Sequence, residues 1–185
     1  MRHAVTGRNA LPLGVVLAGG AARRAGGDKM RALHHGRPLL LWAVDALRAA
    51  VPEVVVLAKA DTLLPELPVP VWHEPPAPRH PLAGVAHALG YARGRAVLVC
   101  AGDVPEPPPE LLARLAADRG DAPAVVPRHA GGAEPLVALY RPVALAALRA
   151  AAAGSHPARR AVEELNPTWV SIAPLRNVNY PNVKA

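Results

Sequence analysis

The chain has 185 residues, of which 51% are apolar, but it contains no Phe and only three Trp and three Tyr. This length fits one compact domain, so two independent folds are not expected, and the core must be built from Ala, Val and Leu. The formal net charge of +7 favours anionic ligands, yet the arginines are spread along the chain with few aromatic residues for base stacking, which argues against nucleic acid as a partner.

The apolar pattern and the cysteine content exclude several further classes. The longest apolar runs, such as residues 13–18 and 96–101, are far too short to span a bilayer, so no membrane partner is expected. No apolar stretch of signal-peptide length precedes Gly14, which predicts a cytoplasmic location. Cys100 is the only cysteine, and this excludes an internal disulfide and a cysteine-based zinc cluster.

Short β-rich runs alternate along the chain with segments that have helical apolar spacing. Residues 1–12 are expected to form an N-terminal extension, and residues 13–185 a single domain. The runs predict strands at residues 13–18, 53–58, 69–72, 95–100, 124–127, 136–140 and 168–173. Helices are predicted at residues 38–50, 82–93, 109–119, 143–153 and 157–165. Gly120 and Gly154 are placed to end the third and the fourth of these helices.

This alternation predicts an α/β fold. Parallel strands need crossover connections, and helices in those connections cover both faces of the sheet. We therefore expect a Rossmann-like three-layer sandwich with a mostly parallel mixed sheet. In such a sheet the functional loops gather at the carboxyl ends of the strands.

The first predicted strand continues directly into a glycine-rich loop, because residues 17–29 read LAGGAARRAGGDK. Glycines let backbone N–H groups approach phosphate oxygens. Arg24 and Lys29 can neutralise the negative charge that develops on a triphosphate. The loop therefore predicts a site for a polyphosphate.

Other interpretations of this loop are weaker. A P-loop has Ser or Thr after a Gly-Lys pair, whereas here Asp28 precedes Lys29 and Met30 follows it. The glycine spacing also differs from that of the dinucleotide-binding fingerprint. The remaining structural alternative is a glycine-rich turn with solvated cations.

An acidic residue follows the fourth predicted strand. Asp103 lies in a Gly-Asp-Val-Pro segment just after an apolar run, where a carboxylate is unfavourable unless it meets a cation. Mg²⁺ prefers one or two carboxylates together with phosphate oxygens, so Asp103 is predicted to bind Mg²⁺. A helix N-cap or a turn role beside Pro105 is the alternative.

The LAGGAARRAGGDK loop resembles the signature of molybdenum cofactor guanylyltransferases and related nucleotidyltransferases. Further segments are similar to later motifs of this family and occur in the expected order, so that the resemblance covers essentially residues 13–181. These segments are RPLL at 37–40, HPLAG at 80–84, GDVP at 102–105, PLVALYR at 135–141 and NVN at 177–179. Together they are specific for the superfamily and less specific for the acceptor.

The resemblance implies which residues bind the nucleotide. In the family, guanine is recognised by an acidic residue before the PLAG loop and by the LAGG backbone, which here is Leu17, Ala18, Gly19 and Gly20. Glu74 is the nearest match for the acidic residue, and Gly84 of the PLAG loop is placed in the same site. A carboxylate can accept hydrogen bonds from guanine N1 and N2, whereas cytosine offers no such pair of donors. An ordinary exposed loop residue is the alternative for Glu74.

The implied activity is transfer of GMP from GTP to the terminal phosphate of molybdopterin, with release of pyrophosphate. Lys29, Arg24 and a Mg²⁺ ion on Asp103 would stabilise the charge during in-line attack, and an anionic phosphate needs no general base. Asn179 is similar to the family asparagine near the acceptor, although a turn role is equally compatible. The implied partners are GTP, molybdopterin, the proteins that deliver molybdopterin and the oxidoreductase that receives the product.

Two kinds of alternative function stay open. Molybdopterin cytidylyltransferases and transferases that act on a sugar phosphate or phospholactate use the same chemistry on other substrates. A non-catalytic carrier of nucleotide or cofactor would retain the glycine-rich loop, but it would not need the chemistry of Asp103.

The chain departs from the family pattern at positions that bear on loop packing, base choice and the acceptor. These positions are Ala25, His80, Glu134 and Tyr180. The sequence pattern groups none of the eight histidines into a metal-binding constellation. His34, His35 and His73 are expected in loops with surface or packing roles.

Overall fold

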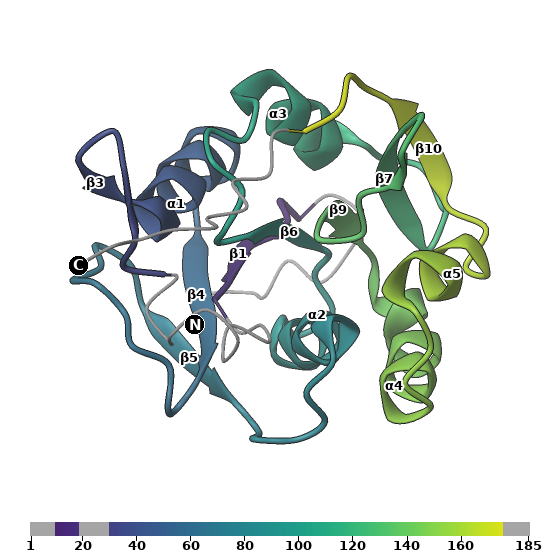
Figure 1. The fold of residues 1–185 in the computed structure, drawn as a ribbon. Helices are drawn as coiled ribbons and strands as arrows, with labels where there is room; N and C mark the ends of the chain where they lie inside the picture. Colours follow the sequence, from purple (N-terminus) through teal and green to yellow (C-terminus); the bar gives the residue numbers. More distant parts are fainter. Residues whose placement is uncertain (1–9, 19–29, 176–185) are drawn as a thin grey trace, which may run out of the picture.

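An eight-stranded sheet forms the centre of the protein, with helices against both faces (Figure 1). The structure is a computed structural model that describes residues 10–18 and 30–175. The strands of this sheet are β1 (Leu13–Leu17), β4 (Val54–Lys59), β5 (Val71–Glu74), β6 (Val97–Ala101), β7 (Ala124–His129), β8 (Gly132–Ala133), β9 (Val137–Tyr140) and β10 (Thr168–Ser171). The helices are α1 (Leu39–Ala50), α2 (Pro81–Tyr91), α3 (Pro109–Ala117), α4 (Leu145–Ala153) and α5 (Ala158–Glu163), with a 3₁₀ turn η2 (Pro142–Ala144).

The strand order is β10-β7-β9-β6-β1-β4-β5, with β8 paired to β7. The strands β6, β1, β4 and β5 are parallel, and β10 is parallel to β7. Along this path only the strand β9 differs in direction, because it runs antiparallel to both β6 and β7. The sheet is therefore mixed and mostly parallel, which confirms the predicted α/β architecture.

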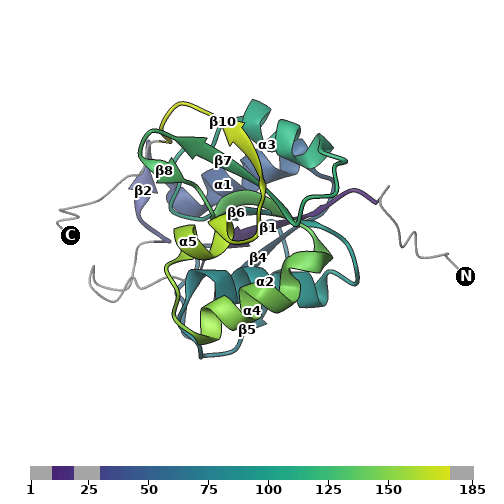
Figure 2. The same cartoon turned by 90° about the vertical axis from the view of Figure 1, so that its right-hand side faces the viewer.

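The two faces of the sheet bury separate apolar cores. α1 and α3 cover one face, and α2 and α4 cover the other, as Figure 2 shows from the side. Along β1, Val16 belongs to the first core, while Val15 and Leu17 belong to the second. Strands buried on both faces need continuous apolar sequences, and this explains the valine-rich runs without polar alternation.

The predicted elements agree with the structure except near their ends, at a hairpin before α1 and at the two-residue strand β8, neither of which was predicted. α3 ends at Ala117 rather than at Arg119, and Gly120 is not its stop residue. Asp118 is already extended, and its Oδ1 accepts a hydrogen bond of 3.0 Å from the Gly120 N–H, so a local turn follows the helix. Gly154 is the C-cap of α4, as predicted.

A short hairpin between residues 33 and 38 was not predicted. It consists of β2 (Leu33–His34) and β3 (Arg37–Pro38), joined by His35 and Gly36. Both linking residues have positive φ, at 50° and 74°, as a two-residue hairpin turn of the primed type requires. Strands of two residues carry too little periodicity to be recognised in a sequence.

None of the helices in the described part of the chain is both long and apolar enough to cross a membrane.

Candidate functional site

The parallel strands end at one edge of the sheet, and the predicted site residues of the described segments lie there. Leu17 ends β1 and Ala18 follows it, Glu74 ends β5, and Asp103 follows β6. The Gly102 N–H donates to the Leu17 carbonyl at 3.0 Å, which ties the Asp103 turn to the end of β1. The carboxyl edge therefore gathers these residues as expected for a doubly wound sheet.

Gly84, at the start of α2, makes this edge tight. A Cβ atom added to Gly84 would lie 3.3 Å from Leu17 Cδ2 and 3.4 Å from Glu74 Oε2. The end of β1, the end of β5 and the first turn of α2 thus converge on one place. A side chain at position 84 would occupy space between Leu17 and the Glu74 carboxylate.

Several predicted site residues lie outside the described residues. They are Gly19, Gly20, Arg24, Lys29 and Asn179, and the departures Ala25 and Tyr180 lie outside as well. Their assignment to the nucleotide, the reaction and the acceptor stays a prediction.

Asp103 is partly exposed on the turn that follows the fully buried strand β6. It is not the N-cap of α3, because that helix begins at Pro109 and Pro108 is its N-cap. Burial, and secondly the negative charge of Asp103, raises the pKa of the Cys100 thiol to about 12. Cys100 is therefore a neutral packing residue at physiological pH, and Asp103 is the group at this turn that offers charged oxygen to a cation.

The turn is closely packed at the residue before Asp103. A Cβ atom at Gly102 would lie 2.5 Å from Leu40 Cδ1 and 3.2 Å from Met30 Sδ. We expect Gly102→Ala to lower the free energy of unfolding by about 1–3 kcal/mol, because the buried Leu40 side chain must move. Thermal or denaturant unfolding measures this loss.

The matched control for this substitution is Gly90→Ala in α2. Its Cβ would meet only the flexible end of Arg149, with Nη2 at 3.3 Å. Alanine is the better helix former, so Gly90→Ala should leave stability unchanged or raise it by up to about 1 kcal/mol. Equal stability of the two variants would contradict the packing argument at Gly102.

Glu74 is held by a buried cation that the sequence analysis did not identify. Lys59 Nζ lies 3.4 Å from Glu74 Oε1 and donates to the Pro75 carbonyl at 2.6 Å. The two side chains are only 9% and 7% exposed. Glu74 is therefore not an ordinary exposed loop residue, and the signal for Lys59 was a lysine at the end of an otherwise apolar strand.

His80, one of the departures from the family pattern, has a structural role. It is the N-cap of α2, and its Nδ1 accepts a hydrogen bond of 3.2 Å from the Leu82 N–H. The other ring nitrogen, Nε2, then carries the proton and donates to the His156 carbonyl at 2.8 Å. The family usually has glycine at this position, which could form neither side-chain bond. The histidine caps α2 and links it to the segment after α4.

Glu134, a second departure, is also engaged. Its Oε1 lies 2.8 Å from His129 Nε2 and 3.9 Å from Arg159 Nη2. His129 and Glu134 are 10% and 15% exposed, so the pair is largely shielded at the end of β7. The carboxylate at position 134 is thus balanced by neighbours of this chain rather than left isolated.

Two hollows lie away from the centre of this edge. One, of about 190 Å³, is bordered by Glu74 and by α2 and α4, and His87 contributes to its wall. Among the described residues, His87 Nε2 is buried without a hydrogen-bond partner. The other hollow, of about 430 Å³, lies at the opposite edge beside Asp118 and Arg141, and no predicted site residue lines it.

The sequence pattern grouped none of the histidines, but the structure brings two of them together with a glutamate. His34 and His35 of the hairpin lie beside Glu106, and one possible ligand atom from each residue lies within 4.8 Å of the others. This group contains two imidazoles, whereas the site predicted at Asp103 offers a carboxylate. Sequence reasoning missed it because Glu106 is 72 residues from His34.

Comparison with known proteins identifies the family. The family model described as MobA-like NTP transferase domain matches residues 14–168. A protein of Chloroflexus aggregans named probable molybdenum cofactor guanylyltransferase is 36% identical over 168 residues, which cover 87% of this chain and 80% of that protein. The molybdenum cofactor guanylyltransferase of Acidiphilium cryptum is 39% identical over 141 residues, which cover 71% of this chain and 67% of that protein.

Solved structures share the fold at lower identity. Molybdopterin-guanine dinucleotide biosynthesis protein A of Archaeoglobus fulgidus is 23% identical with a TM-score of 0.70, over 86% of this chain and 83% of that chain. The 2-C-methyl-D-erythritol 4-phosphate cytidylyltransferase of Thermus thermophilus is 22% identical with a TM-score of 0.66, over 92% of this chain and 93% of that chain. The fold is thus common to enzymes named for different bases. The family match and the curated relatives show that this chain belongs to the MobA-like NTP transferases and is a nucleotidyltransferase.

Proposed function

We propose that the protein transfers GMP from GTP to the terminal phosphate of molybdopterin and releases pyrophosphate. The observation that carries the proposal is the position of the Glu74 carboxylate, which faces Leu17 and Gly84 at the carboxyl edge of the sheet. The relatives named molybdenum cofactor guanylyltransferase support the same reaction.

Glu74 suits recognition of guanine rather than cytosine. Its Oε1 is paired with Lys59, while its Oε2 lies toward Gly84. Each carboxylate oxygen has more than one acceptor site, so Oε1 can keep the lysine and still accept a hydrogen bond from the base. A fixed carboxylate can then accept from N1–H and the N2 amino group of guanine. Cytosine has only acceptors at the corresponding O2 and N3 positions.

Asp103 is the residue proposed to hold the metal. Its carboxylate stands on a partly exposed turn at the same edge, and carboxylate oxygen is the donor that Mg²⁺ prefers. When bound, Mg²⁺ would neutralise charge on the triphosphate and on the departing pyrophosphate. The glycine-rich backbone, Arg24 and Lys29 are proposed to bind the phosphates. Alignment of an already anionic acceptor phosphate then needs no general base.

The test supplies Mg²⁺ and molybdenum cofactor with GTP, CTP or ATP in separate reactions, and it measures pyrophosphate and the dinucleotide product. GTP is expected to be the preferred substrate. Preference for CTP would overturn the guanine assignment but keep the nucleotidyl transfer. Absence of pyrophosphate with every nucleotide would overturn the proposed reaction and favour a carrier of nucleotide or cofactor.

Glu74→Gln tests base recognition directly. The amide keeps the shape but replaces one acceptor oxygen by an NH₂ donor that opposes the donors of guanine. We expect kcat/KM for GTP to fall roughly 10- to 100-fold, the range for losing a hydrogen bond to a charged group. Steady-state kinetics with GTP measure this change, and the exposed Glu66→Gln is the control. An unchanged kcat/KM for GTP would remove Glu74 from base recognition.

A further inference from the structure

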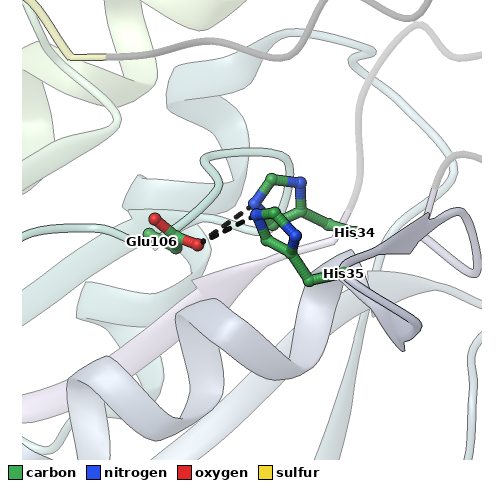
Figure 3. A group of neighbouring side chains, drawn as sticks. All are labelled: His34, His35 and Glu106. Carbon is green, nitrogen blue, oxygen red and sulfur yellow. Dashed lines mark hydrogen bonds and ion pairs between the residues drawn. The ribbon is translucent and has the colours of Figure 1, made fainter.

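Two histidines of the β2–β3 hairpin face a glutamate from the loop after β6, as Figure 3 shows. His34 Nε2 lies 3.3 Å from Glu106 Oε1, and His35 Nε2 lies 3.6 Å from the same oxygen. We propose that His34, His35 and Glu106 form a binding site for a divalent transition-metal ion of the zinc type. This site is separate from the carboxylate of Asp103 and does not depend on the proposed nucleotide reaction.

The two distances from the imidazole nitrogens to the Glu106 oxygen fit tetrahedral coordination, and all three ligand atoms lie within 4.8 Å of one another. Zinc binds imidazole nitrogen and carboxylate oxygen at about 2.0–2.2 Å, which places two ligands of a tetrahedron roughly 3.4 Å apart. The two distances to Glu106 Oε1, 3.3 and 3.6 Å, lie on either side of this value. An ion can therefore be placed between these atoms with only small side-chain movements.

The chemistry of the ligands selects the class of metal. Two imidazoles and one carboxylate form a common zinc ligand set that leaves a fourth position for water. Mg²⁺ instead prefers oxygen ligands and retains its waters, so a site that contains two imidazoles discriminates against it. The ordinary alternative is a metal-free pair of surface ion contacts, since His35 and Glu106 are 69% and 55% exposed.

Trp42 of α1 contacts the hairpin that carries both histidines. Trp42 Nε1 donates to the His34 carbonyl at 3.2 Å, and the indole ring stands edge-on to the two imidazoles, with centroids 5.7 and 6.4 Å away. The guanidinium of Arg37 lies over the Trp42 ring, 5.6 Å from its centroid. Fixed ligand orientation of this kind supports metal affinity.

The position of the site gives it a structural consequence. The hairpin begins four residues after Lys29, and Glu106 is three residues after Asp103. A bound ion would join these two segments through His34, His35 and Glu106. We therefore expect the ion to stabilise the loop after β6 relative to the hairpin.

Calorimetric titration of the tag-free chain with Zn²⁺, in saturating Mg²⁺ to occupy oxygen-only sites, tests the proposal. One Zn²⁺ per chain is expected to bind, and His35→Ala and Glu106→Gln should each weaken binding at least about tenfold. His73→Ala removes another exposed histidine and should leave the affinity unchanged. Absence of Zn²⁺ binding, or equal affinity in all variants, would overturn the site.

Co²⁺ provides a second measurement that does not depend on enzyme activity. Tetrahedral Co²⁺ absorbs strongly in the visible range, and its proximity should quench the fluorescence of Trp42. The visible absorption and the quenching are both expected in the unmodified chain and not in Glu106→Gln. Because the Glu106 side chain is exposed, this substitution should leave the chain folded, so unfolding would not account for the loss of both signals. Visible absorption of the octahedral type, or identical quenching in both proteins, would reject coordination by these three residues.

Discussion

Asp103→Asn is expected to reduce kcat for pyrophosphate release by a factor on the order of 10³, about 4 kcal/mol of transition-state stabilisation. Asparagine keeps the size of the side chain and a carbonyl oxygen, but it removes the charge that holds Mg²⁺ beside the triphosphate. Because Asp103 is partly exposed on a turn, the folded state should survive the substitution. Initial rates of pyrophosphate release with GTP, together with thermal unfolding, separate the two effects.

The matched control is Glu110→Gln, which neutralises an exposed acid in the first turn of α3. This control should retain nearly full activity. If Asp103 acts through the metal, raising the Mg²⁺ concentration should restore part of the lost rate in Asp103→Asn and leave the control unchanged. Full activity of Asp103→Asn at low Mg²⁺ would contradict a metal-binding role for this residue.

Lys59→Met is expected to lower the free energy of unfolding by roughly 3 kcal/mol. Methionine preserves the apolar stem, but Glu74 then keeps a carboxylate that is 7% exposed and has lost its cation. An uncompensated buried charge is far more destabilising than the loss of an exposed ion pair. Denaturant unfolding of the full chain at neutral pH measures the loss.

Arg95→Met is the control, because the partner of Arg95 in its ion pair is Glu53, whose side chain is 54% exposed. Its loss should be about 0–1 kcal/mol. The double variant Lys59→Met/Glu74→Gln removes both charges and should recover part of the stability. A double variant no more stable than Lys59→Met would contradict the argument that the unpaired, buried Glu74 carboxylate causes the loss of stability.

Much of the fold follows from local patterns. The valine-rich runs around residues 15, 55 and 98 are apolar at successive positions, which requires burial on both faces and therefore helices on both sides of the sheet. The structure confirms these layers and the family comparison confirms the nucleotidyltransferase family that the motifs suggested. The boundary errors, such as the early end of α3, arise because helix ends depend on a few turn contacts.

The candidate site was only partly determined by sequence. The motifs indicated Glu74 and Asp103, and the parallel topology places both at the carboxyl edge. The burial of Glu74 and its pairing with Lys59 depend on β4 lying next to β5, because the register sets Lys59 opposite Glu74. A local sequence pattern does not show which residues of two separate strands pair with each other.

The amino-acid sequence by itself therefore determined the layers, the family and the positions of the principal motifs, because apolar periodicity and short motifs are properties of neighbouring residues. Tertiary structure alone decided that β9 inserts antiparallel between β6 and β7, that Lys59 meets Glu74, and that the histidine pair meets Glu106. These features join residues that are distant in the chain. They depend on which strands and loops become neighbours when both apolar faces of the sheet are covered.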